Sequence, residues 1–147
     1  MSASSLLLVF AVGMLMPLQA GVNGLLAKTV GHPLRAALLQ NSVGATFILT
    51  VLLLTGAFHY SAATLAQTRW WYWVGGLCGA TLVVSALYFA PRIGAATFFI
   101  TILAGQLSAS LLFEHFGLVG YPVRPISVAR IAGVLCVGLG IWLLRRA

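Results

Sequence analysis

Five long runs of apolar residues follow one another along the chain, separated by short stretches that are polar or rich in Gly and Pro. The runs cover roughly residues 4–27, 34–58, 70–90, 95–116 and 128–144. A helix needs about 20 apolar residues to cross the hydrocarbon core of a bilayer. Strands of a membrane barrel would instead alternate over about ten residues, which these runs do not. The pattern therefore predicts an all-α membrane protein, a five-transmembrane-helix bundle.

The connections between the runs carry residues that end helices. Gly31–Pro33 closes the first connection, residues 59–69 form a polar second one, and residues 117–127 form the fourth. The third, Pro91–Gly94, is expected to be a tight turn, because Pro and Gly stop helices. Residues 1–147 are expected to form a single five-span membrane domain. The first run is interpreted as a span and not as a cleaved signal peptide, because no Lys or Arg precedes it.

Composition agrees with a membrane location. Hydrophobic residues make up 61% of the 147 residues and charged residues only 6%, whereas soluble domains carry about 25% charged residues. The formal net charge of +7 comes from eight scattered Lys and Arg. Nucleic-acid binding would need these cations on one face, so they are better explained as residues at membrane edges. Cys78 and Cys136 lie inside apolar runs and are interpreted as small packing residues.

The distribution of cations predicts the orientation only weakly. With five spans, five Lys and Arg fall on the side of the carboxyl terminus and three on the other side. The positive-inside rule therefore favours a cytoplasmic carboxyl terminus by a narrow margin. Insertion in both orientations, followed by pairing of two opposite copies, would give the inverted symmetry common among transporters. An antiparallel homodimer is thus our hypothesis, with a single orientation and a parallel dimer, or a different partner chain, as the alternative.

Several polar residues recur at helical spacing inside the predicted spans. Such groups are costly in hydrocarbon unless they find partners, so they are expected to face one another or a wet cavity. The residues we expect to bind a small-molecule substrate are Gln19, Asn23, Asn41, Tyr88, Gln106, Ser110 and Glu114.

Glu114 is the only carboxylate in the sequence. Acids inside membrane spans are functional candidates by default, and this one could couple proton exchange to transport. Glu114 is also near the end of its predicted helix, so it could instead reach the headgroups or pair with Arg124. Both interpretations stay open.

An aromatic cluster opens the third run, and a cation follows the same run. Trp70, Trp71 and Trp73 with Tyr72 are expected to anchor at the headgroup level, or else to form a cation-binding wall at the mouth of a pocket. Arg92, in the third connection, would anchor at the headgroups or gate the cavity. No cofactor and no metal site are expected, since His and Cys lack ligand spacing, and no catalytic constellation that would make this an enzyme is visible.

Four sequence runs carry a family resemblance. The runs "PLQAGVNGLLA" (residues 17–27), "NSVGA" (41–45), "PRIGAA" (91–96) and "AGQLSASLLFEHFGLVG" (104–120) resemble the YdcZ-like inner-membrane family. The resemblance implies membership of the drug/metabolite transporter superfamily, a multi-pass location in a bacterial-type inner (plasma) membrane, and five-span units or ten-span fused pairs. By position, the polar signature of the family falls on Gln19, Asn23, Asn41, Gln106 and Glu114.

Two departures limit what the resemblance implies. Family members often have Asp where this chain has Glu114, which keeps the charge. The small multidrug exporters of the superfamily use an acid in their first helix, and this first helix has none, so their proton–drug mechanism does not transfer directly. The expected function is a small exporter of metabolites or drugs, cationic ones included, working by alternating access as a homodimer. A passive ion channel of dual topology and an accessory membrane subunit are the alternatives.

Overall fold

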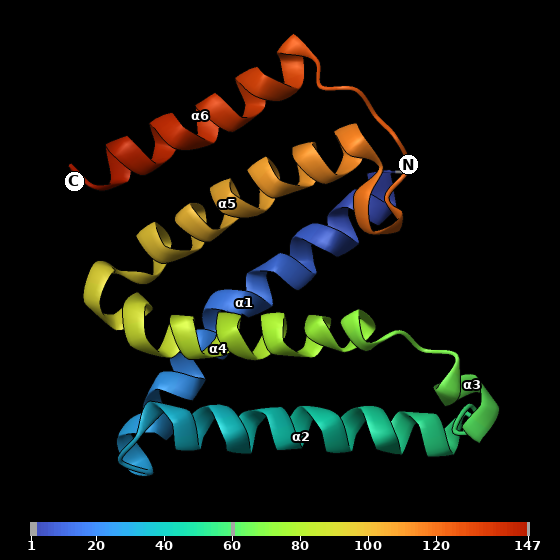
Figure 1. Ribbon diagram of the computed structural model, residues 1–147. Helices are drawn as coiled ribbons and strands as arrows, with labels where there is room; N and C mark the ends of the chain where they lie inside the picture. The colour runs from blue at the N-terminus through green and yellow to red at the C-terminus, as the bar shows by residue number, and fades with distance from the viewer. Residues whose placement is uncertain (1–2, 60, 147) are drawn as a thin grey trace. The chain divides into compact units, whose positions relative to one another are not determined.

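The computed structural model describes residues 3–59 and 61–146, and all the secondary structure in these ranges is helical (Figure 1). The long helices are α1 (Ala3–Thr29), α2 (Pro33–Leu54), α4 (Val74–Ile93), α5 (Ala95–Phe116) and α6 (Val128–Leu144). Short turns of helix occupy the connections, namely α3 (Ala62–Ala66), η1 (Trp70–Trp73) and η2 (Leu118–Gly120).

Four helical segments are long and apolar enough to cross a membrane: Ser4–Thr29, Pro33–Leu54, Trp70–Ile93 and Ala95–Phe116. The fifth, α6, is equally apolar but has only 17 residues. At 1.5 Å per residue it spans roughly 26 Å, slightly less than a typical hydrocarbon core. The predicted all-α membrane architecture is confirmed, with α6 as a shorter fifth helix.

Two predicted helix ends need correction. The second helix ends at Leu54 and not near residue 58, because Gly56 adopts a positive φ of 67° that leaves the helical region. Pro91 does not begin a turn; it lies inside the last turn of α4, which continues to Ile93. Proline removes only one hydrogen bond there. The chain turns at Gly94, whose φ of 85° favours glycine.

The first connection is built as its sequence predicts. Gly31 adopts a φ of 74°, and Pro33 begins α2. The Nδ1 atom of His32 accepts the backbone N–H of Leu34 at 3.2 Å, which satisfies one of the orphan donors at the start of the helix.

The chain divides into two compact units between Pro91 and Arg92. In the first unit, α1 packs against α2, and a small core joins them to α4. Ala36, Ala37 and Leu87 form its buried centre, and none of them is more than 6% exposed. Small side chains at this point let the helix backbones approach closely. The partly buried residues around it are Leu26, Ala27, Val30, Val83 and Val84.

The second unit is a hairpin in which α5 and α6 lie side by side (Figure 1). Phe98 of α5 is buried. A Cβ atom added at Gly140 of α6 would lie 2.9 Å from Cδ1 of Ile100, so this glycine permits the close approach of the two helices. Most other large apolar side chains in both units are exposed, as expected for helices surrounded by lipid or by a further packing partner.

Candidate functional site

The end of α5 and the connection after it form one hydrogen-bonded structure. Gly117 closes α5 in the left-handed conformation, with φ 62°. The chain then folds back: the backbone N–H of Arg124 donates to the carbonyl of Glu114 at 2.8 Å. The backbone N–H of Ile126 donates to Nδ1 of His115 at 3.3 Å. The last turn of α5 therefore holds the segment that leads into α6.

The start of α6 places Arg130 beside this turn. Ser127 is the N-cap of α6, and its Oγ accepts the backbone N–H of Arg130 at 3.4 Å. Arg130 is the third residue of the helix, so its side chain leaves from the first turn. Its Nη1 also lies 3.5 Å from the carbonyl of Arg124. The cap and the connection thus fix where the guanidinium can reach.

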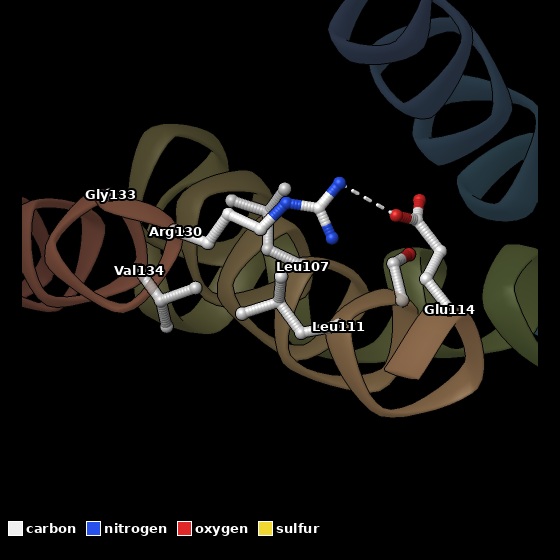
Figure 2. Close-up of a pocket in the computed structure, with 7 residues that line it drawn as sticks. Leu107, Leu111, Glu114, Arg130, Gly133 and Val134 are labelled. Carbon is white, nitrogen blue, oxygen red and sulfur yellow. Dashed lines mark ion pairs between the residues drawn. The ribbon is translucent and has the colours of Figure 1, made fainter. Parts of the chain in front are cut away.

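Arg130 and Glu114 form an ion pair across the hairpin, with Nη2 and Oε2 2.9 Å apart (Figure 2). The two side chains are 29% and 23% exposed, respectively. The contact is close, but Oε2 has no hydrogen bond of good angular geometry within the described residues. The pairing of Glu114 with Arg124, expected as one alternative, is wrong. Arg124 contacts Glu114 through its backbone, and the side-chain partner is Arg130.

The ion pair lines a groove of about 340 Å³ between α5 and α6. The groove has a charged end and an apolar floor, and it is large enough for a small molecule. Ser110 lies one helical turn before Glu114 and adds a hydroxyl. The lining residues are Leu107, Ser110, Leu111, Glu114, Arg130, Gly133 and Val134 (Figure 2).

A second groove, of about 480 Å³, lies between α1 and α2 in the first unit. Asn23 lines it and is only 6% exposed. Gln40 lines it too, and its Oε1 is buried without a hydrogen-bond partner among the residues that the structure describes. Two carboxamides therefore share an otherwise apolar groove, whose remaining lining residues are Leu26, Leu39, Val43 and Gly44.

Comparison with known proteins places the chain in a family. The sequence model of the family described as "Putative inner membrane exporter, YdcZ" matches residues 4–143. The chain belongs to this family. It is 27% identical over 121 residues to Inner membrane protein YdcZ of Escherichia coli (strain K12), and the alignment covers 82% of this chain and 80% of that relative. No solved structure matches the chain. The YdcZ resemblance drawn from the four sequence runs is confirmed, together with an inner-membrane, multi-pass type of protein.

The structure distributes the remaining expected binding residues of this YdcZ-family chain outside the two grooves. Gln19, Asn41 and Gln106 are exposed on α1, α2 and α5. Tyr88 is half-buried on α4. The structure therefore brings Ser110 and Glu114 together in one groove and places Asn23 in the other.

Sequence reasoning missed Arg130 and Gln40. Arg130 is among the cations that the sequence assigns to membrane edges, and 15 residues that include a connection separate it from Glu114. Gln40 is next to Asn41 in the chain, but one residue turns the side chain by about 100° around a helix. A glutamine inside an apolar run is costly without a partner, so its position alone could have indicated that Gln40 lines a cavity.

The aromatic cluster forms η1, just before α4. Trp70, Trp71 and Trp73 are exposed, and the guanidinium of Arg69 lies 4.9 Å from the ring centroid of Trp71. A cation from the chain itself thus contacts this aromatic surface. Arg92 lies in the last turn of α4 and is exposed.

Proposed function

We propose that this YdcZ-family chain is a small membrane transporter that exports small metabolites or drugs across a bacterial inner membrane. The family match carries the proposal, because it extends over residues 4–143 and so includes all but the outermost residues of the long helices. A match of this extent supports an exporter role for the chain, and exporters are not an enzyme class.

The groove at Glu114 is the proposed centre of substrate recognition. It combines an ion pair between two apolar helices with an apolar floor, and charged groups on membrane helices are expensive to maintain without a function. Within the first unit, Asn23 and Gln40 offer a separate pair of hydrogen-bonding side chains for a substrate. Gln19, Asn41, Tyr88 and Gln106 are further proposed substrate contacts, and proton exchange at Glu114 is one way to drive export.

An antiparallel homodimer is the proposed working unit, acting by alternating access. Two features of the chain support it. The helices leave most large apolar side chains exposed, and the Lys and Arg count gives only a weak orientation bias. Two opposite copies could rock against each other around a shared cavity, as the inverted halves of larger transporters do. Membership of the drug/metabolite transporter superfamily would account for this design.

A thermal-shift screen of the purified full-length protein tests the proposal. Ligands that bind the folded state raise its stability by mass action, so amines, amino acids and drug-like cations can be compared directly. We expect a class of small polar compounds to stabilise the wild type and to lose this effect in Glu114→Gln. A screen in which no compound distinguishes the two proteins would argue against a substrate site at Glu114.

A further inference from the structure

The charges of the Glu114–Arg130 pair both lie at unfavourable helix ends. Glu114 is in the last turn of α5, where the helix dipole is already negative, and Arg130 is in the first turn of α6, where it is positive. Neither helix stabilises its own charge, so each charge depends on the other, 2.9 Å away. The charged end of the groove therefore carries one negative and one positive group side by side.

A ligand with a single charge would suit this groove poorly. A cation that bound Glu114 would leave Arg130 without its carboxylate beside the positive end of α6, and an anion at Arg130 would leave Glu114 equally uncompensated. Removing one partner of a pair that is largely shielded from water is strongly unfavourable. A ligand that carries both charges could contact both groups and leave the site neutral.

We propose that the groove binds zwitterions, that is, small molecules with an ammonium and a carboxylate on an apolar body. The ammonium would contact Glu114. The carboxylate would accept bidentate hydrogen bonds from the guanidinium of Arg130, whose planar geometry matches carboxylates. The apolar body would lie on Leu107, Leu111 and Val134, which line the same groove. This inference rests on the proposed transport function and gives its substrate class, with Arg130 as the residue that selects against simple cations.

Three compounds with one phenyl-ethyl body separate the charge classes at pH 7. Phenylalanine is a zwitterion, phenethylamine a cation and 3-phenylpropanoate an anion. Their dissociation constants for the purified full-length protein can be measured by calorimetry. We expect phenylalanine to bind at least about tenfold more tightly than either analogue, a difference of ~1.4 kcal/mol.

The variants address the two charges of the groove. Glu114→Gln and Arg130→Gln should each remove the preference for phenylalanine. Each of them leaves one lone charge that can disturb folding, so the double variant Glu114→Gln/Arg130→Gln, which has no lone charge, gives the decisive comparison. It should bind phenylalanine at least tenfold more weakly than the wild type. Thr101→Val, an exposed position of α5 outside the groove, is the matched control and should bind as the wild type does.

Three results would overturn the inference: tighter binding of phenethylamine or of 3-phenylpropanoate than of phenylalanine, no binding of any of the three, or unchanged phenylalanine binding in the double variant. Flux across liposomes distinguishes this failure from failure of the proposed function. Phenylalanine binding with the expected charge preference but without flux would refute the exporter and keep the site. Flux of another compound without phenylalanine binding would refute the zwitterion site alone.

Discussion

The ion pair between Glu114 and Arg130 makes a quantitative prediction about the stability of the α5–α6 hairpin. At the observed 2.9 Å, Coulomb's law gives roughly 6 kcal/mol of attraction for an effective dielectric constant of about 20. The cost of desolvating both groups offsets much of this attraction. Exposed pairs have a net value of about 0–1 kcal/mol, and breaking a buried pair costs about 3–5 kcal/mol. Both side chains are about one quarter exposed, so we expect a coupling of about 1–3 kcal/mol.

A double-mutant cycle isolates this coupling. The four proteins are the wild type, Glu114→Gln, Arg130→Gln and the double variant. Their free energies of unfolding can be measured by titrating mixed micelles with a denaturing detergent and following helix content by circular dichroism. The stability losses of the two single variants should add up to more than the loss of the double variant. The reason is that each single variant retains one charge at the unfavourable end of its helix.

Independent sites add within about 0.5 kcal/mol. A coupling energy below that value would refute the argument that the two charges depend on each other. It would also remove the basis for treating the groove as a site with two matched charges. A parallel cycle between Glu114 and Arg124 supplies the comparison, since the Arg124 contact runs through its backbone and a side-chain change there should show little coupling.

Three further predictions concern other parts of the chain. Gly117→Ala should lower the free energy of unfolding by about 1–3 kcal/mol, because Gly117 has φ 62° and its new Cβ would lie 2.8 Å from Cγ2 of Val123. The control Gly105→Ala changes a helical position with open space around it and should be neutral or stabilising. Equal effects of the two substitutions in unfolding titrations would contradict this account. Gln40→Leu should raise stability in detergent by roughly 1 kcal/mol, because it removes a buried oxygen that lacks a partner, and a clear loss of stability would show that this oxygen is satisfied. A reporter fused to the carboxyl terminus should be labelled from both sides of the membrane, and labelling from one side alone would exclude dual insertion.

The apolar runs predicted the helices well because a bilayer leaves little choice of structure. Every backbone group in lipid must be paired within the chain, so length and hydropathy determine which segments become helical. The errors lie at helix ends, where hydropathy says little. The second run stays apolar past Leu54, but the positive φ of Gly56 ends α2 there. Pro91 was expected to stop its helix, yet in the last turn it interrupts a single bond and α4 continues to Ile93.

The candidate site was predicted less completely, because its parts come from different helices. Glu114 and Ser110 share one face of one helix, and spacing alone brought them together. Arg130 could not be paired with Glu114 by spacing, since the backbone bonds of Arg124 and Ile126 set how the connection folds back. Asn23 lines a groove in the first unit, and its polar neighbour there is Gln40 and not Asn41.

Counterflow in proteoliposomes is the measurement that tests the central claim most directly. Vesicles holding the full-length protein are loaded with the compound that gives the largest thermal shift, then diluted into a trace of the same compound in labelled form. A carrier with its substrate site at Glu114 predicts transient, saturable accumulation of label, which Glu114→Gln abolishes. Uptake equal to that of protein-free vesicles, or uptake that rises linearly without saturation, would contradict the account.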